Sequence, residues 1–275
     1  MCVRVAVWWC MASIAMQALA SGLTVGVHNG AYARENGIVA QRMTREWAAS
    51  AADADLAERH ADGRFTPVPF VLDRTGGAPV LVWQMPGTTA PNAVRRFEWR
   101  TGQASRAAPV SDLVVSVDNT RIAIANGYFR LAHPVRGKGG FPQEIEYVRS
   151  GHADPELYFL DRIVRKQADG RLMQYCANVC EDAVARVAFA SPLRVVVEVR
   201  TGFGQRAAET PGQPQVVYRY TYSAHSPVVQ VEARYTRTDD GPWHELHFLH
   251  LSRKEAHYTS FVTGDGGDTY PLQPK

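Results

Sequence analysis

The sequence predicts an all-β protein, in which a small N-terminal β-sandwich is followed by a larger antiparallel β-sandwich. Short runs rich in β-branched and aromatic residues recur along the chain, and Gly, Pro, Asn and Asp separate them. Only residues 45–55 are rich enough in good helix formers to suggest a short helix. A polar stretch without periodicity, residues 101–111, divides the runs into two groups. We therefore expect a β-sandwich domain over 21–103, a linker over 104–111 and an antiparallel β-sandwich over 112–275.

Residues 1–20 have the features of a signal peptide. Arg4 supplies a positive charge, residues 5–15 form an apolar segment, and Ala18-Leu19-Ala20 is an Ala-x-Ala cleavage site. The apolar segment is too short to favour the alternative, an uncleaved membrane anchor of about 20 residues. No later segment could span a membrane as a helix, so we predict a secreted or periplasmic protein with no membrane span after cleavage.

The N-terminal domain is expected to contain about six or seven short strands, as a small sandwich requires. Ala61-Asp62-Gly63 predicts a hairpin between two of them, because Gly adopts positive φ readily. Pro67 and Pro69 indicate that the second arm is an edge strand or an irregular one, since proline donates no ladder hydrogen bond. The expected strands are residues 23–28, 38–43, 56–60, 64–72, 79–85 and 93–100.

The C-terminal domain is expected to consist of longer strands joined by hairpins. Asn126-Gly127 and Ala168-Asp169-Gly170 are the strongest turn signals in this part of the chain. The last four runs, residues 215–224, 227–237, 243–251 and 257–263, follow one another with turn residues between them and predict one antiparallel meander. The earlier expected strands are residues 113–117, 121–125, 128–133, 144–149, 157–166, 171–175, 185–190 and 193–201.

Charge and motifs exclude several classes of function. The net charge of +3 and the lack of a Lys/Arg run argue against nucleic acid as a partner. The chain has no Gly-x-Ser-x-Gly elbow and no dinucleotide fingerprint, which weakens serine hydrolase and dehydrogenase hypotheses and predicts no cofactor. No metal site is predicted, because Asp265 and Asp268 are too few carboxylates to specify a calcium site and are expected in a solvated tail.

The signal peptide removes Cys2 and Cys10, which leaves Cys176 and Cys180. Two nearby cysteines in an oxidising compartment favour a disulfide that closes a small loop. The alternative is a metal pair, but a structural zinc site needs four ligands and no second pair has recognisable spacing. Because the loop would be so short, we expect the bridge to hold a local turn rather than the whole fold.

Residues 243–251 read Trp-His-Glu-Leu-His-Phe-Leu-His-Leu and carry the densest set of reactive side chains. On a strand, alternate residues share a face, so Trp243, Glu245 and His247 are expected to lie together. Glu245 and His247 would then be about 7 Å apart at Cβ and could act as an acid/base pair on a bound sugar. The structural alternative is a His-Glu hydrogen bond that covers a sheet face.

Tyr218, Tyr220 and Tyr222 alternate along one strand and share a face. A row of aromatic rings on an open sheet face could stack against sugar rings. Packing between two sheets is slightly favoured over this platform, because a sandwich core also needs such a row.

Arg136 and Lys138 flank glycines in Arg-Gly-Lys-Gly-Gly and could cradle an anion such as an acidic sugar. The sequence is not a P-loop, because Gly-Lys-Ser/Thr is absent. A mobile hairpin loop without a ligand explains the glycines equally well.

From Ile124 onward the chain resembles the galactose-mutarotase-like β-supersandwich of polysaccharide lyases and several glycoside hydrolases. The segments that carry the resemblance are Ala-Asn-Gly-Tyr-Phe-Arg-Leu (125–131), Gly-Gly-Phe-Pro (139–142), Ser-Pro-Leu-Arg-Val-Val-Val-Glu-Val (191–199), Tyr-Arg-Tyr-Thr-Tyr-Ser (218–223) and Trp-His-Glu-Leu-His (243–247). They cover about half of the chain and contain no catalytic signature. The resemblance implies a large two-layer sandwich that acts on carbohydrate. A full supersandwich needs more chain than follows the linker here.

The leading hypothesis from sequence is a secreted carbohydrate-active protein of the polysaccharide lyase or glycosidase kind. In a lyase, His247 would abstract the proton α to a uronate carboxylate, Arg136 or Lys138 would neutralise that carboxylate, and a tyrosine would protonate the leaving oxygen. The alternatives are a non-catalytic glycan-binding module and a structural sandwich attached to a catalytic partner. Exposure of the tyrosine row discriminates between the first two, since a binding platform must be open.

Overall fold

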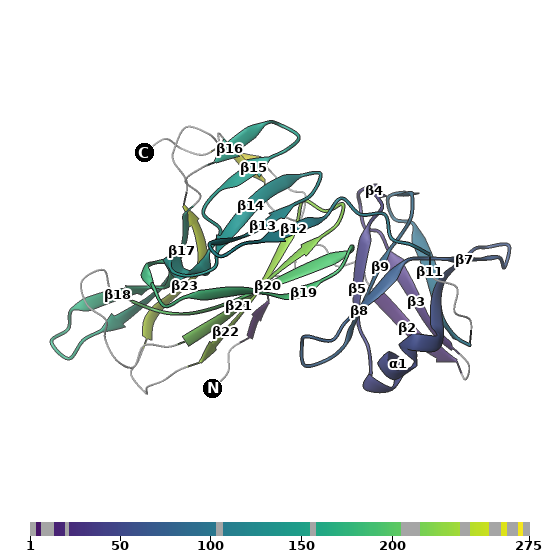
Figure 1. Cartoon of the computed structure of the whole chain (residues 1–275), viewed down its shortest axis with the longest axis horizontal. Helices are drawn as coiled ribbons and strands as arrows, with labels where there is room; N and C mark the ends of the chain where they lie inside the picture. The colour runs from purple at the N-terminus through teal and green to yellow at the C-terminus, as the bar shows by residue number, and fades with distance from the viewer. Residues whose placement is uncertain are drawn as a thin grey trace.

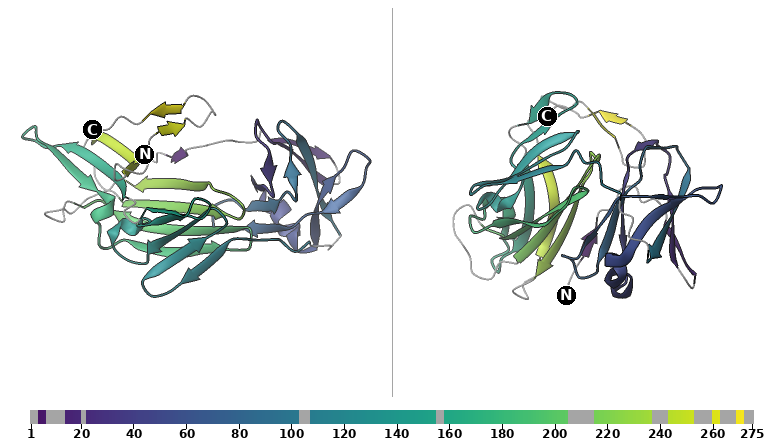
Figure 2. Two further views of the ribbon diagram at one scale, coloured as in Figure 1. Left: turned by 90° about the horizontal axis from the view of Figure 1, so that it is seen from above. Right: turned by 45° about the vertical axis from the view of Figure 1, so that its right-hand side comes forward.

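The computed structural model describes residues 4–6, 14–19, 22–102, 107–154, 158–204, 215–236, 243–252, 260–262 and 269–271. Strands dominate these residues, and their one α-helix, α1 (Arg45–Ala49), has five residues, which confirms the all-β class. Figures 1 and 2 show two units side by side, an N-terminal unit that begins with β2 and a C-terminal unit that consists of the strands from β12 onward together with β1, which pairs with β22. No helix in the described part of the chain is long and apolar enough to cross a membrane.

The N-terminal unit consists of two main antiparallel sheets that face each other. One has the strand order β2-β3-β11-β6-β7 and the other the order β5-β9-β8, and β4 and β10 form a small pair. The strands are β2 (Ile14–Leu19), β3 (Gly22–His28), β4 (Arg34–Glu35), β5 (Ile38–Arg42), β6 (Ala54–Arg59), β7 (Phe65–Pro67), β8 (Phe70–Asp73), β9 (Val80–Gln84), β10 (Thr88–Thr89) and β11 (Val94–Thr101).

Local sequence explains several features of this unit. Gly63, at a φ of +82°, closes the hairpin between β6 and β7, and β7 with its Pro67 is an edge strand, as predicted. The expected helix is present but short, and a 3₁₀ turn, η1 (Ser50–Asp53), follows it. Trp83 and Phe97 meet edge to face inside the sandwich, with ring centroids 5.6 Å apart, and anchor a core separate from that of the C-terminal unit.

The C-terminal unit contains three larger sheets. Their strand orders are β1-β22-β21-β20-β19, β12-β13-β14-β15-β16 and β18-β17-β23, and β24 pairs with β25. The strands are β1 (Arg4–Ala6), β12 (Val114–Val117), β13 (Arg121–Ala125), β14 (Phe129–Pro134), β15 (Ile145–Tyr147), β16 (His152–Asp154), β17 (Tyr158–Lys166), β18 (Leu172–Cys176), β19 (Val184–Ala190), β20 (Arg194–Gly202), β21 (Gln215–Ser223), β22 (Val229–Thr236), β23 (Trp243–Ser252), β24 (Ser260–Val262) and β25 (Thr269–Pro271).

The predicted four-strand meander is wrong beyond its second strand. β20, β21 and β22 are consecutive antiparallel neighbours, but β23 leaves this sheet and pairs with β17 in the third one. The inner faces of the sheets enclose one core, which includes Ile122, Ile163, Val197 and Tyr218. The strand pattern of β23 is compatible with either sheet, so its place depends on contacts distant in sequence.

The two units contact each other through the loop after β8. The Asp73 carboxylate lies 3.6 Å from the Arg194 guanidinium on β20, and Arg219 Nη2 on β21 donates to Thr75 Oγ1 at 2.9 Å. Gln84 Nε2 also donates to the carbonyl of Val110 at 3.1 Å, which ties β9 to the segment before β12. The first two contacts join residues on opposite sides of the expected linker, and the third joins Gln84 to Val110 within that linker.

Parts of the predicted signal peptide are described as β1 and β2, which pair with β22 and β3. Export and cleavage stay predictions.

Candidate functional site

Glu245 and His247 lie side by side on β23, as the strand period predicts. His247 Nε2 is 2.7 Å from Glu245 Oε2, and Arg162 Nη2 on β17 lies 3.3 Å from the same nitrogen. The register brings the three together, because Arg162 is opposite His247 and Val164 is opposite Glu245. The Glu245 and His247 side chains are 46% and 35% exposed, so a ligand can reach them.

In a neutral imidazole, His247 Nε2 cannot form hydrogen bonds to both Glu245 and Arg162 at once. A neutral imidazole nitrogen either donates to the Glu245 carboxylate or accepts from the Arg162 guanidinium. The shorter distance, 2.7 Å, favours donation to Glu245, and this leaves the lone pair on Nδ1. The hydrogen bond from His247 lowers the pKa of Glu245. The cluster therefore combines an oriented base, a carboxylate and a guanidinium with unused donors.

Trp243 does not lie on this face, contrary to the prediction. A register shift between Val164 and Arg165 interrupts the alternation of β23 before Glu245. Trp243 is half-buried and packs against the core.

The prediction of a sugar platform at the tyrosine row is wrong, and the packing alternative is confirmed. Tyr218, Tyr220 and Tyr222 are 0%, 1% and 0% exposed. Their rings lie between the sheets, where Tyr218 contacts Phe141 and Tyr222 contacts Phe129. The sheet of β21 is covered on this face, so a sugar cannot stack there.

The buried tyrosines instead bind two polar side chains that the sequence analysis missed. Tyr218 and Tyr235 both donate hydrogen bonds to Asp161 Oδ2, the second at 2.5 Å, and Asp161 is fully buried. Burial raises the pKa of Asp161 to about 6, although the two tyrosine hydrogen bonds oppose the shift. Asp161 shares a face of β17 with the fully buried Ile163, and alternation with this apolar residue could have indicated that Asp161 points inward.

His133 is the second buried polar group. It lies 2.8 Å through Nδ1 from the carbonyl oxygen of Gly140, so Nδ1 carries the hydrogen and Nε2 accepts from the Tyr222 hydroxyl at 2.5 Å. Desolvation lowers the pKa of His133 to about 4, so the imidazole is neutral at pH 7. His133 shares a face of β14 with the buried Phe129 and Leu131, a signal that could have found it.

The Arg136–Lys138 loop is not an anion cradle, which corrects the second binding prediction. Its glycine amides bond to protein carbonyls: Gly137 N donates to Ala183 O at 3.0 Å and Gly139 N to Cys180 O at 3.0 Å. Gly139 and Gly140 are buried in the turn η2 (Lys138–Gly140). The glycines allow close packing against neighbouring chain, while the flanking Arg136 and Lys138 are exposed.

The predicted disulfide is not formed, since the thiols of Cys176 and Cys180 are not bonded to each other. Cys176 ends β18 and exchanges two backbone hydrogen bonds with Gly204, while the turn η3 (Ala177–Val179) carries the chain to Cys180. Backbone pairing holds this turn without a covalent link. In the described residues no group of three or more His, Cys, Asp or Glu could hold a metal ion, and Asp265 and Asp268 lie outside those residues.

A shallow groove of about 370 Å³ crosses the outer face of the β12–β16 sheet. Its floor contains alanines, and Arg130 and Glu146 form an ion pair of 2.8 Å within it. Arg121 and Glu144 also line it. This groove was not predicted from the sequence, although Glu144 and Glu146 are two residues apart and share a face if the segment is a strand.

No family model and no curated protein matches the chain. Two solved structures are similar to it: a protein in the glycosyl hydrolase family 38 and an alpha-mannosidase, from Enterococcus faecalis and Enterococcus faecalis V583 respectively. The match to the first has a TM-score of 0.46 and 9% identity, and it covers 78% of this chain and 31% of the chain of that protein. The second has a TM-score of 0.42 and 10% identity and covers 81% of this chain and 28% of its own. The chain thus spans less than a third of either protein.

Proposed function

We propose that the chain acts on carbohydrate by a lyase reaction on a uronate-containing polysaccharide, with Arg162, Glu245 and His247 as the reactive cluster. The observation that carries the proposal is His247 Nε2, 2.7 Å from Glu245 Oε2 and 3.3 Å from Arg162 Nη2. A base held by a carboxylate beside a guanidinium is the arrangement that proton abstraction next to a substrate carboxylate requires. Arg162 replaces Arg136 and Lys138 in this role.

The proposed reaction assigns one task to each side chain. Arg162 binds the uronate carboxylate and stabilises the negative charge that develops on it. Glu245 accepts the Nε2 hydrogen of His247, so Nδ1 removes the proton on the carbon next to the carboxylate. The electron pair of that bond forms a carbon–carbon double bond as the glycosidic bond to the neighbouring carbon breaks. The leaving oxygen takes the proton from the protonated His247, because the predicted tyrosine donors are buried.

The test measures the absorbance of unsaturated uronate product on pectate, alginate and a glycosaminoglycan. His247→Ala and Arg162→Gln should abolish product, and Glu245→Gln should reduce it by about a hundredfold or more, within the range attributed to a positioned base. His244→Ala is the matched control, because His244 is exposed on the same strand and is not part of the cluster. The lyase hypothesis fails if wild type makes no product from any of these polymers.

A second candidate function is non-catalytic glycan binding in the groove across β12–β16. Its support is a volume of about 370 Å³ lined by both cations and carboxylates. Ala123→Trp should fill the groove and abolish binding of an oligosaccharide, while His247→Ala should leave that binding unchanged. Binding without product, lost in Ala123→Trp, would favour this function over the lyase.

We also propose that the protein is exported, on the strength of the signal-peptide features of residues 1–20. N-terminal sequencing of the protein from the periplasm or medium should begin at Ser21. Recovery of an intact N-terminus from the cytoplasm alone would contradict export.

A further inference from the structure

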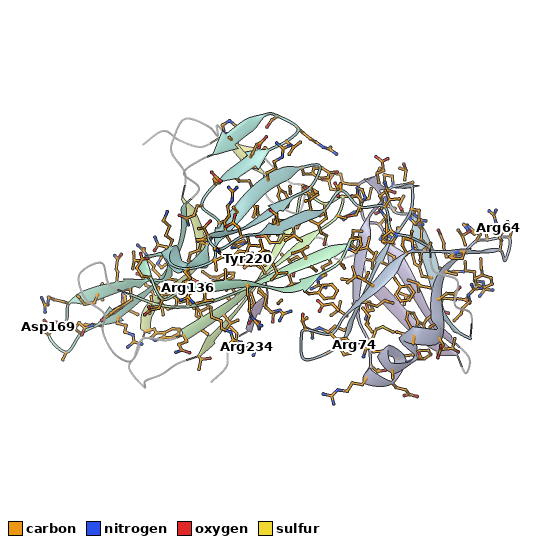
Figure 3. The ribbon with its side chains drawn as sticks, in the orientation of Figure 1. Arg64, Arg74, Arg136, Asp169, Tyr220 and Arg234 are labelled. Carbon is orange, nitrogen blue, oxygen red and sulfur yellow. The ribbon has the colours of Figure 1, made fainter. Side chains whose placement is uncertain are left out.

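A cleft of about 280 Å³ opens beside the loop between β8 and β9, far in sequence from the reactive cluster. Arg45, Arg74, Gly76, Gly77 and Pro79 line it. Two of these five residues are cations and none is an acid. Figure 3 labels Arg74, on the side of the N-terminal unit that is nearer to the C-terminal unit.

The walls of the cleft are held by contacts on several sides. Arg74 Nη2 donates to the carbonyl of Ala48 at 2.6 Å, which fixes one edge of the guanidinium against α1. The carbonyl of Pro79 accepts from Met43 N at 2.8 Å, and this keeps the loop next to the residues that lead into α1. A site held in this way loses little conformational entropy when a ligand binds.

The other side of the same loop is bound to the C-terminal unit. Thr75 accepts from Arg219 Nη2 at 2.9 Å through its hydroxyl, and the buried Asp73 lies 3.6 Å from Arg194. The nearest acid on the loop, Asp73, is therefore engaged away from the cleft. Glu46 neighbours Arg45 in sequence, but successive helix residues do not face each other.

We propose that this cleft binds an oxyanion, a sulfate, phosphate or carboxylate group carried by a ligand. Arg45 and the unused guanidinium donors of Arg74 would supply charge-assisted hydrogen bonds, which match the geometry of such groups. The glycines keep the approach open, since a Cβ on Gly77 would meet no heavy atom within 4 Å. The volume suits a small anion or one ring that carries it, and not a large cofactor.

The experiment titrates the full chain with sodium sulfate at constant ionic strength, by isothermal calorimetry, with chloride as the balancing anion. Gly77→Asp places a carboxylate in the open space of the cleft, and Arg45→Gln removes one of the two charges. Each change should weaken sulfate binding by about ten- to a hundredfold, the range of one charge-assisted hydrogen bond. A uronate disaccharide and inorganic phosphate, titrated in parallel, distinguish a carboxylate ligand from a sulfate or phosphate.

Two matched controls separate the cleft from general charge and folding effects. Gly77→Ala adds a methyl group without charge, and Arg64→Gln removes a cation from an exposed hairpin, with 70% of that side chain accessible. Both should bind sulfate within about twofold of wild type. If Gly77→Asp fails to fold, the sulfate affinity of Arg45→Gln still tests the proposal. The proposal is overturned if wild type shows no saturable binding of sulfate, phosphate or the uronate disaccharide. It is also overturned if Gly77→Asp, Arg45→Gln and both controls change the sulfate affinity by the same factor, as a general effect of charge would.

Discussion

Replacing Asp161 with Asn should change how stability depends on pH. In the folded protein the Asp161 pKa is about 6, against an ordinary value of 3.8, because the carboxyl is buried. The folded state therefore holds this proton more tightly than the unfolded state between pH 3.8 and pH 6. Protonated Asp161 therefore adds to the free energy of unfolding below pH 3.8, the pKa in the unfolded chain, and this contribution is lost as the pH rises from 3.8 to 6.

The expected magnitude follows from the shift of about two pKa units. At 1.36 kcal/mol per unit, wild type loses about 3 kcal/mol of unfolding free energy from this group between pH 3.8 and pH 6. Asn cannot ionise, and its amide oxygen can still accept from Tyr218 and Tyr235. The free energy of unfolding of Asp161→Asn minus that of wild type should therefore increase by about 3 kcal/mol from pH 3.5 to pH 7. Burial of the new amide NH₂ destabilises the variant by an amount that does not depend on pH, so it cancels when the two pH values are compared.

His133 acts in the opposite direction. Its pKa falls from 6.5 to about 4, so the folded state disfavours the charged imidazole. Stability from His133 is lost as pH falls through this window, by about 3 kcal/mol. In wild type the two losses offset each other between about pH 4 and 6. Asp161→Asn lacks the opposing contribution of the carboxyl, so its free energy of unfolding should fall as His133 is driven to protonate at low pH.

Urea unfolding at pH 3.5 and pH 7, followed by near-ultraviolet circular dichroism of the buried tyrosines, measures the effect. Asp169→Asn is the matched control, because Asp169 is exposed at the tip of the β17–β18 hairpin (Figure 3). Its profile should follow wild type. The reasoning is refuted if Asp161→Asn differs from wild type by the same amount at both pH values.

Two further predictions concern close packing and the cysteines. Gly140→Ala should destabilise the fold by about 3 kcal/mol or more, since φ is +71° and the added Cβ would clash with Val199 Cγ1. Gly170→Ala, with a φ of +85° but no atom within 4 Å of the new Cβ, should cost only about 1–2 kcal/mol in the same chemical denaturation, and equal costs would show that packing is not the cause. Denatured, unreduced protein should be alkylated at both Cys176 and Cys180 in peptide mass spectra, and a linked peptide would restore the disulfide.

Much of the local structure could be predicted from the sequence. Alternation of apolar residues and the positions of Gly, Asn and Asp predicted most strands, the hairpins at Gly63 and Gly170, and the neighbouring positions of Glu245 and His247 on one face. These features depend on residues a few positions apart, and strand period and turn chemistry act over that range. The all-β class follows from them.

Which sheet a strand joins, and which face is covered, only the tertiary structure decided. Tyr218 would alternate in the same way on an open face as on a closed one, and only the second sheet makes it core. The same holds for β23, whose pairing with β17 brings Arg162 to His247 across 85 residues of chain. The physical reason is that burial and pairing are free energies of contact between distant segments, while the side-chain period of a strand is identical on its covered and its open face.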